Sequence, residues 1–521
     1  LGLILLSMVV STRYLYWRIT ETLVFQTGFE YVLGYGLFVA ELYAWTIMFF
    51  GYIQTLHPLE RTIVPMPENL ADWPTVDVYI PTYNEDLSVV MDTVLAAQEL
   101  EYPADKMNIY LLDDGGRQAF AAFAARAGVG YIAREEHNHA KAGNLNHAMG
   151  LTDGELICVF DCDHIPTTGF LQSTVGGFRT DPGLSMLQTP HYFYSQDPYE
   201  RNLAVGDGLP REGELFYGPV QKGNDFWNAT FFCGSCAVIR RAALDEVDGF
   251  AVETVTEDAH TALKMQRKGW RTAFLGLPLA AGLATERLSL HIGQRARWAR
   301  GMTQIMRLDN PLFGRGLTLP QRLCYLNAML HFMFPLPRVV FLTAPLAYLL
   351  IGQNIIASSA QMILAYALPH LFHAVYTNSR LNGRYRHTLW GEIYESSLCF
   401  HLVKPTLVTF FNPRRGKFNV TEKGGLLNET FFDVDPVKPH LVVAFLLMAG
   451  LGWGVVRLFW HEYYGVQPDV MALNLFWGGF SLFILFATIA VARERRQVRS
   501  SVRVNLDLPA TLYMVEGHTL A

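Results

Sequence analysis

The segment with the most distinctive chemistry is 290–301, which contains Gln294, Arg297 and Trp298 in the order Gln-x-x-Arg-Trp. Alanine and arginine favour helices, and no proline interrupts the segment, so we expect a helix there. Gln294 and Arg297 are three residues apart and therefore share a face. An arginine pairs well with a phosphate oxygen, and a tryptophan ring offers a flat apolar surface to a sugar. The segment indicates a site for a phosphorylated sugar, although a basic amphipathic helix on a membrane explains the same composition.

A pair of alternating carboxylates, Asp161 and Asp163, follows an expected strand. Alternate residues of an extended segment point the same way, so the two carboxylates can converge on one cation. Mg²⁺ or Mn²⁺ is commonly held by such oxygen ligands together with substrate phosphates. The same two-aspartate pattern also occurs by chance and at helix starts.

Two further acidic sites could be catalytic but can also be explained by local structure. Asp113 ends another expected strand, but the aspartate and glycines that follow it are also typical of a turn. Asp258 closes a Thr-Glu-Asp triplet, which suits a catalytic carboxylate and equally suits the capped first turn of a helix.

Two other stretches could contact a donor or an acceptor. Lys141 lies in 139–144 and offers a cation beside backbone amides near an expected helix start, which suits a diphosphate; an ordinary surface turn is the alternative. Phe231, Phe232 and Cys233 precede small residues, which suits either a buried strand or the wall of an acceptor cleft.

Strands and helices alternate in the region that holds these residues. The alternation predicts an α/β domain with a parallel sheet and right-handed crossovers. Ligands bind beyond the carboxyl ends of the strands in such sheets, and two of these ends carry the aspartates at 113 and at 161 and 163. The expected strands are 76–80, 107–112, 129–133 and 155–160, with a helix at 118–127.

Composition places part of the chain in a membrane. Apolar residues make up 51% of the 521 residues, and the net charge of −6 gives no basic excess for a nucleic acid polymer. Arginines after residue 492 place that end in the cytoplasm. The expected apolar spans lie at 1–10, 31–55, 325–351, 355–375, 441–460 and 472–492. The expected divisions are membrane helices in 1–60, a soluble domain in 61–317, membrane helices in 318–492 and a further segment, 493–521.

The six cysteines include one C-x-x-C pair, Cys233 and Cys236. A zinc site needs a second pair, which the sequence does not supply, so we expect reduced thiols in a cytosolic environment.

In their order, these sites match the D, D-x-D, T-E-D and Q-x-x-R-W motifs, and the chain resembles the processive family 2 glycosyltransferases. It is most similar to the bacterial cellulose synthase catalytic subunits, over nearly its whole length. The further stretches that carry this resemblance are 71–77, 81–85, 139–144, 187–190, 231–235, 255–258 and 418–424.

The resemblance implies a GT-A type, Rossmann-like domain that is inserted between membrane helices forming a glucan channel. It implies that Asp258 is the general base and that Asp113 and Asp163 belong to the catalytic group. The implied nucleotide and donor contacts are Tyr83, Glu85, Asp113, Lys141, Gln294 and Arg297. Asp161 and Asp163 are the implied Mg²⁺ ligands. The implied acceptor contacts are Trp298, Phe231, Phe232 and Cys233. A gating loop in the segment 377–440 is implied at Phe418, Val420, Thr421 and Lys423.

The implied activity is the transfer of glucose from UDP-glucose to β-1,4-glucan, with inversion, and export of the product across the bacterial inner membrane from a cytosolic domain. A membrane-anchored periplasmic accessory subunit is the implied partner. Arg499 and Arg503 match the start of a PilZ domain that binds the activator cyclic di-GMP, a domain that 493–521 contains only in part. Another processive synthase, for hyaluronan, chitin, curdlan or a mannuronan, is the alternative.

Overall fold

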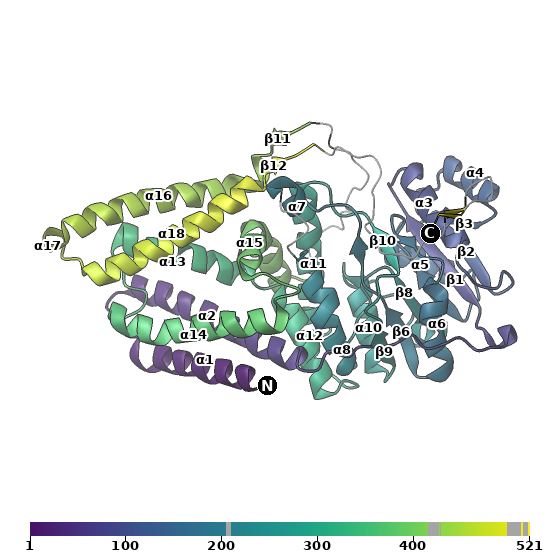
Figure 1. Cartoon of the computed structure of the whole chain (residues 1–521), viewed down its shortest axis with the longest axis horizontal. Coiled ribbons are helices and arrows are strands. Elements are labelled where there is room, and N and C mark those ends of the chain that lie inside the picture. Colours follow the sequence, from purple (N-terminus) through teal and green to yellow (C-terminus); the bar gives the residue numbers. More distant parts are fainter. Residues whose placement is uncertain (205–209, 415–426, 428, 497–511, 514–518, 521) are drawn as a thin grey trace.

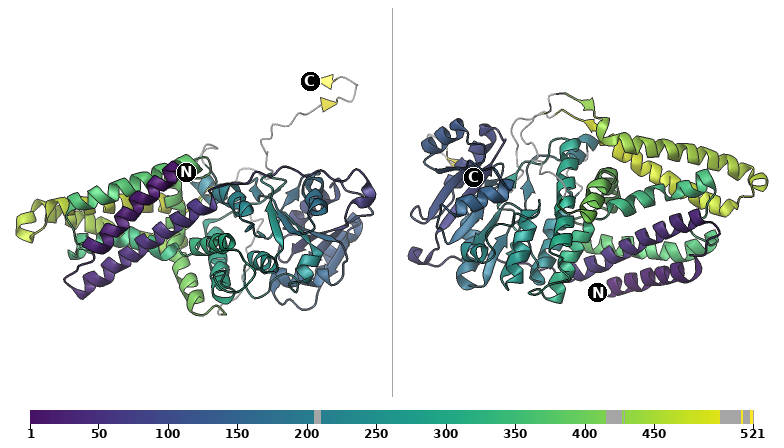
Figure 2. Two further views of the ribbon diagram at one scale, coloured as in Figure 1. Left: turned by 90° about the horizontal axis from the view of Figure 1, so that it is seen from below. Right: turned by 180° about the vertical axis from the view of Figure 1, so that it is seen from behind.

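The computed structural model describes residues 1–204, 210–414, 427, 429–496, 512–513 and 519–520. It contains a domain built on a seven-stranded sheet and, beside it, a bundle of long helices (Figure 1). Figure 2 shows from two further sides that the bundle lies to one side of the sheet.

The sheet has the strand order β3-β2-β1-β4-β8-β6-β9. Its strands are β1 (Val76–Thr82), β2 (Met107–Asp113), β3 (Gly130–Ala133), β4 (Leu156–Val159), β6 (Leu184–Gln188), β8 (Ala237–Arg240) and β9 (Arg271–Phe274). The four strands predicted from the sequence are β1 to β4, and they pair in parallel as predicted.

The wholly parallel sheet that we expected is wrong at one strand. β8 runs antiparallel to both β4 and β6, which makes the sheet mixed. Cys236 N–H donates to the Val159 carbonyl at the carboxyl end of β4, 2.8 Å away, so β8 enters the sheet from the edge at which β4 leaves it. That direction depends on a contact between distant segments.

Both faces of the sheet are covered, which is why its strands are nearly continuous apolar runs. In β1, Val78 and Ile80 face one core while Tyr79 faces the other. The first core includes helices α3 (Leu87–Gln98), α4 (Gln118–Ala127) and α6 (Phe170–Thr180). The second includes α5 (Ala140–Met149), α9 (Arg241–Asp245) and α10 (Glu257–Arg267). The edge of the sheet at which the parallel strands end lies between these two layers and carries the loops that follow the strands.

Helix α11 (Leu288–Leu308) contains the Gln-x-x-Arg-Trp segment, so the expected helix is confirmed. It runs between the sheet domain and the bundle and packs on α7 (Pro198–Leu203), α12 (Leu319–His331) and α15 (Thr388–Phe411) (Figure 1). A small sheet of β5 (Ile165–Pro166), β10 (Ala280–Gly282) and β7 (Tyr192–Phe193) lies next to the main one.

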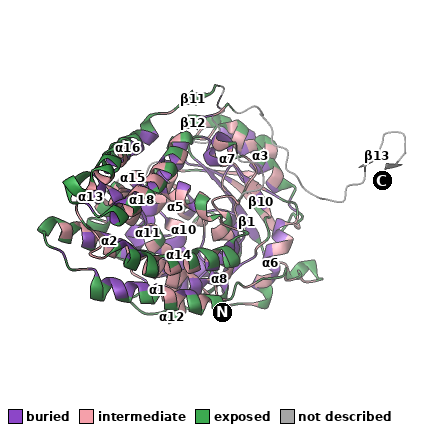
Figure 3. Ribbon diagram, turned by 60° about the vertical axis from the view of Figure 1, so that its left-hand side comes forward, coloured by how far each residue is buried: buried purple, intermediate pink, exposed green. Residues whose placement is uncertain are grey.

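The remaining long helices are α1 (Gly2–Glu21), α2 (Gly28–Gln54), α13 (Pro335–Ile351), α14 (Ala360–Asn382), α16 (Lys438–Phe459) and α18 (Pro468–Ala490). In the described part of the chain, three helical segments are long and apolar enough to cross a membrane: Gly28–Gln54, Asp435–Phe459 and Pro468–Ala490. Exposed residues alternate with buried ones along the helices of the bundle (Figure 3). Many of the exposed ones are apolar, for example Phe445 on α16, which is 66% exposed.

Three expected spans are not among these three segments. The span at 325–351 is two helices, α12 and α13, bent by 50° at a break after His331, where Pro335 supplies no backbone donor. The spans at 1–10 and 355–375 overlap α1 and α14, which are not among the segments long and apolar enough to cross a membrane.

Charged residues between the helices of the bundle are paired. Arg18 Nε on α1 lies 2.8 Å from Glu41 Oε2 on α2, and Arg338 on α13 forms ion pairs with Glu392 and Glu395 on α15. Charged side chains that lie between apolar helices are usually paired in this way.

Candidate active site at the carboxyl edge of the sheet

Asp161 and Asp163 lie just beyond β4, next to His164. One ligand atom from each of the three residues lies within 4.8 Å of the others. His164 Nδ1 lies 3.3 Å from Asp163 Oδ1, and the Asp161 N–H donates to Ser235 Oγ at 2.8 Å. Two carboxylates and an imidazole this close fit a divalent cation. The sequence prediction missed His164, although it directly follows the D-x-D pattern.

Lys141 links the aspartate pair to the backbone at Gly234, shortly before β8. Its Nζ donates to Asp161 Oδ1 at 2.5 Å and to the Gly234 carbonyl at 2.6 Å. Burial alone would lower the pKa of Lys141, but the Asp161 carboxylate outweighs it and the pKa is raised. The structure thus brings together two residues that we predicted separately, with the lysine in its charged form.

Asp258 lies in the first turn of α10, as the helix-start alternative required. Its Oδ1 accepts the Ala259 N–H at 2.8 Å. Burial, followed by the negative charge of Glu257, raises the pKa of Asp258 to about 7, while the positive charges of Lys141 and Arg297 act in the opposite direction. A carboxylate that exchanges its proton near neutral pH is suited to general base catalysis.

Gly234 lies between Asp258 and Lys141. A Cβ at this position would come 3.2 Å from Asp258 Oδ2 and 3.7 Å from Lys141 Nζ, and its φ of +93° favours glycine. Asp161, Lys141 and Asp258 therefore surround one short stretch of backbone, which forms the centre of the candidate site.

The side chains of residues 231–233, just before Gly234, differ in their exposure to solvent. Phe232 is 1% exposed and packs on Phe250 with ring centres 6.1 Å apart, so its side chain belongs to the core. Phe231 is also buried, whereas Cys233 is half-buried and its N–H donates to Gln188 Oε1 at 2.9 Å. Burial raises the pKa of the Cys233 thiol. All six cysteines are free thiols, as expected. Of the three predicted acceptor contacts in this segment, Cys233 is the most accessible.

An arginine that we did not single out organises the Gln-x-x-Arg-Trp segment. Arg295 binds both carboxylate oxygens of Glu212, at 3.0 and 2.6 Å, and donates to Gln294 Oε1 at 3.0 Å. Its guanidinium carbon lies 4.1 Å from the centre of the Trp298 ring. Gln294 and Trp298 are therefore held by Arg295 on their own helix, and Glu212 anchors that arginine.

Two contacts set the separation of α11 and α10. A Cβ at Gly301 would lie 2.3 Å from Thr256 Oγ1, so the glycine permits the close approach of the two helices. Gln304 Oε1 accepts the Val255 N–H at 2.9 Å. The same side chain donates to the Pro413 carbonyl at 2.8 Å, which ties α11 to the chain just after α15.

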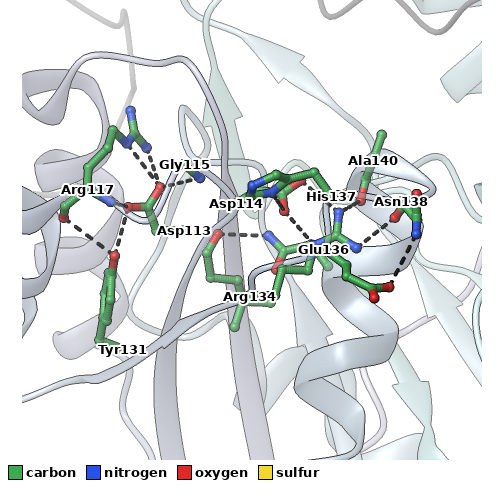
Figure 4. A network of polar contacts seen from close by, with 12 residues as sticks. Asp113, Asp114, Gly115, Arg117, Tyr131, Arg134, Glu136, His137, Asn138 and Ala140 are labelled. Carbon is green, nitrogen blue, oxygen red and sulfur yellow. Dashed lines mark hydrogen bonds and ion pairs between the residues drawn. The ribbon is translucent and has the colours of Figure 1, made fainter.

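The predicted nucleotide contacts lie at the ends of β1 and β2. Asp113 is fully buried and accepts bonds from Arg117 Nε (3.0 Å), Tyr131 Oη (2.9 Å) and two backbone amides. Glu85 Oε2 accepts from Thr82 Oγ1 and the Tyr83 N–H, both at 2.8 Å, while the Tyr83 side chain is 41% exposed. Asp113, with the partners drawn in Figure 4, and Glu85 therefore shape these loops, and the exposed Tyr83 side chain can contact a ligand.

The predicted gating-loop and cyclic di-GMP residues lie outside the described residues. These are Phe418, Val420, Thr421, Lys423, Arg499 and Arg503.

Comparison with protein families gives two matches. The family 2 glycosyl transferases match residues 77–248, and a cellulose synthase family matches residues 232–387. The chain is 56% identical to cellulose synthase 2 of Novacetimonas hansenii over 515 residues, 99% of this chain and 32% of that protein. It is 55% identical to the UDP-forming cellulose synthase catalytic subunit of Pseudomonas fluorescens over 520 residues, 100% of this chain and 70% of that protein.

The chain therefore spans about a third of some curated relatives and about two thirds of others. Among solved structures it is similar to a mannosyltransferase of Pyrobaculum calidifontis, in complex with GDP-Man and Mn²⁺, with a TM-score of 0.54 and 18% identity over 74% of this chain and 100% of that one. This likeness confirms the expected GT-A type fold.

Proposed function

This chain belongs to the cellulose synthase family of glycosyltransferases, and from that premise we propose that it transfers glucose from UDP-glucose to the 4-hydroxyl of a growing β-1,4-glucan. The observation that carries the proposal is the position of Asp258. Its carboxylate has a pKa of about 7 and lies beside Gly234, as does Lys141, the lysine that binds Asp161.

Asp258 is the proposed general base. A sugar hydroxyl is a poor nucleophile near neutral pH, so a carboxylate that accepts its proton is needed. A single displacement by that hydroxyl inverts the anomeric carbon, and an α-linked donor then gives a β-linked product. The proton moves from the 4-hydroxyl to a carboxylate oxygen of Asp258.

The donor diphosphate is proposed to lie beside Lys141 and Arg297, whose charges offset the charge that develops on UDP. Asp161 and Asp163, with His164 next to them, would hold the Mg²⁺ that supplies further positive charge to the diphosphate. Tyr83, exposed beyond β1, is the proposed contact of the uracil.

The acceptor is proposed to lie over Trp298, with Cys233 at its terminal sugar. Trp298 is half-buried and Arg295 packs on its ring, so the indole is fixed in place before a sugar stacks on it. Gln294 would contact the donor from the same helix.

The helical bundle is the proposed path of the product. Three apolar segments and the bent α12–α13 pair support insertion into a bacterial inner membrane, with the sheet domain in the cytosol. Export of the glucan, a periplasmic accessory subunit, and activation by cyclic di-GMP through Arg499 and Arg503 are further parts of the proposal. They rest on membership of the family.

The test uses membranes that carry the full-length protein with its accessory subunit. Labelled UDP-glucose, Mg²⁺ and cyclic di-GMP are supplied, and the insoluble product is digested with a β-1,4-specific endoglucanase. Labelled polymer that the enzyme digests supports the proposal, and Asp258→Asn membranes are the control.

Polymer that resists the endoglucanase would move the function to the alternative, another processive β-glycan. Competition by UDP-N-acetylglucosamine, UDP-glucuronate and GDP-mannuronate then identifies the donor. UDP-glucose that is neither polymerised nor hydrolysed would contradict the proposed donor.

A further inference from the structure

The loop from residue 134 to residue 141 joins β3 to α5 and has an unusual backbone. Two consecutive residues that are not glycine, His139 and Ala140, have φ angles of 62° and 46°. The left-handed region is unfavourable for residues with a Cβ, so contacts elsewhere must hold the loop in this form.

Arg134 supplies those contacts (Figure 4). Its Nη1 donates to the Asn138 carbonyl at 2.7 Å, and its Nη2 donates to the Ala140 carbonyl at 2.9 Å. Its Nε and Nη2 also bind the two carboxylate oxygens of Asp114, at 2.5 and 2.8 Å. Both side chains are buried, with 7% and 6% exposure, so the loop is anchored to the end of β2.

Two further features keep the loop close to Arg134. His137 Nδ1 lies 3.2 Å from Asp114 Oδ1. A Cβ on Gly143 would come 2.1 Å from the Asn138 carbonyl oxygen and 2.5 Å from Arg134 Nη1, so only glycine fits there. Burial would raise the pKa of Asp114, but the hydrogen bonds from Arg134 and His137 prevail and the pKa is lowered, which keeps the carboxylate ionised.

The loop ends at Lys141, whose Nζ reaches Asp161 Oδ1 and the Gly234 carbonyl. We propose that Arg134 is a positioning residue for the donor site: by holding the carbonyls of residues 138 and 140 against Asp114, it places Lys141 and the first turn of α5 where the donor diphosphate binds. This inference rests on the proposed function.

The hydrogen bonds made by residue 134 require an arginine side chain. A guanidinium has five N–H donors in a rigid planar fork, so it can bind one carboxylate and two carbonyls at once. A lysine at this position keeps the charge beside Asp114 but cannot reproduce the fork. Arg134→Lys therefore separates the charge from the geometry.

The test measures the affinity of the full-length protein for UDP with Mg²⁺, and KM and kcat for UDP-glucose, in membranes. The variants are Arg134→Lys and Arg134→Met. The control is Arg240→Met, because Arg240 also binds carbonyls, those of Leu184 and Phe178, but at the amino end of β4.

We expect UDP affinity to fall, and KM for UDP-glucose to rise, by about ten- to a hundredfold in both Arg134 variants, as outer contacts of charged sites commonly show. The control should lose thermal stability without this change. Gly143→Ala, which displaces the same loop by a clash, should reproduce the effect if Arg134→Met does not fold.

The inference would be overturned if UDP affinity and KM stayed unchanged in Arg134→Lys and Gly143→Ala. It would also be overturned if they changed equally in Arg240→Met. Failure of the proposed function is distinguishable, because the unaltered protein would then neither bind UDP nor transfer glucose. Weaker UDP binding in the variants, beside normal binding in the unaltered protein, is the result that bears on Arg134.

Discussion

Asp258 owes its proposed role to its surroundings. Its carboxylate is at the start of α10, where a helix dipole favours the ionised form. Burial and the neighbouring Glu257 carboxylate work against ionisation and raise the pKa to about 7. Lys141 and Arg297 limit this rise, so the group is poised between its two protonation states.

We expect Asp258→Asn to lower glucose transfer by about 10²- to 10⁴-fold, the usual contribution of a general base. UDP binding should change little, because the amide keeps the size of the side chain. Transfer and UDP binding are measured on the same membranes. Equal loss of both would mean that Asp258 supports the structure of the site.

The raised pKa of Asp258 predicts how transfer depends on pH. Below its pKa of about 7 the carboxyl is protonated and cannot accept the hydroxyl proton, so the rate should fall by about tenfold for each pH unit of further acidification. An ordinary aspartate, with a pKa of about 3.9, would give a flat profile over the same range. The rate is measured from about pH 5 to about pH 9. A rate that is constant down to the lowest pH would contradict the assignment.

Helices α10 and α11 carry the proposed base and the Gln-x-x-Arg-Trp residues, respectively, so the distance between the two helices sets the distance between these residues. Gly301 allows α11 to approach Thr256, which precedes α10, and Gln304 fixes the register through the Val255 amide. The residues of α11 that we propose to contact the donor and the acceptor are thereby kept at one distance from Asp258.

We expect Gly301→Ala to lower kcat by about tenfold or more, because its Cβ would lie 2.3 Å from Thr256 Oγ1 and must push the helices apart. Gly293→Ala is the matched control, since Gly293 lies on the same helix and nothing stands within 4 Å of a Cβ there. The control should keep kcat and gain slight stability. A similar kcat for the two variants would show that helix separation is unimportant.

A single buried carboxylate joins the two parts of the molecule. Glu494, which follows α18, accepts from Arg201 Nη2 at 2.6 Å, from Asn202 Nδ2 at 2.9 Å and from the Leu288 N–H at 2.7 Å. These partners belong to α7 and to the first turn of α11. β12 (Arg493–Glu494) also pairs with β11 (Phe431–Phe432), which brings the chain before α16 to the same place. The end of the last helix is thereby tied to the helix that carries Trp298.

We expect Glu494→Gln to lower the free energy of unfolding by about 3–5 kcal/mol, because it leaves the buried Arg201 without its counter-charge. Asp435→Asn is the control, since its ion pair with Lys438 is exposed and its loss should change stability by no more than about 1 kcal/mol. Denaturation in detergent measures both variants. Equal stability of the two would mean that Glu494 is not a structural link.

The sequence alone predicted the candidate site residues and much of the local structure of this protein. The order of the acidic motifs and the Gln-x-x-Arg-Trp segment identified the family, and apolar runs predicted β1 to β4. Of the six expected spans, three coincide with helical segments long and apolar enough to cross a membrane, and the helix at 118–127 is α4. These features depend on residues that are close in the chain. The predicted roles at Asp113, Asp161, Lys141, Asp258 and Arg297 remain proposals, but the fold that positions them is confirmed.

How these elements meet is visible only in the folded chain. The reversed direction of β8, the bend between α12 and α13, His164 beside the aspartate pair, and the Arg134 and Glu494 networks all depend on contacts between distant segments. A local pattern carries no information about such partners, because the same arginine or carboxylate is equally compatible with solvent. Burial, which exists only in the folded chain, makes these contacts necessary and raises the pKa of Asp258 toward neutrality.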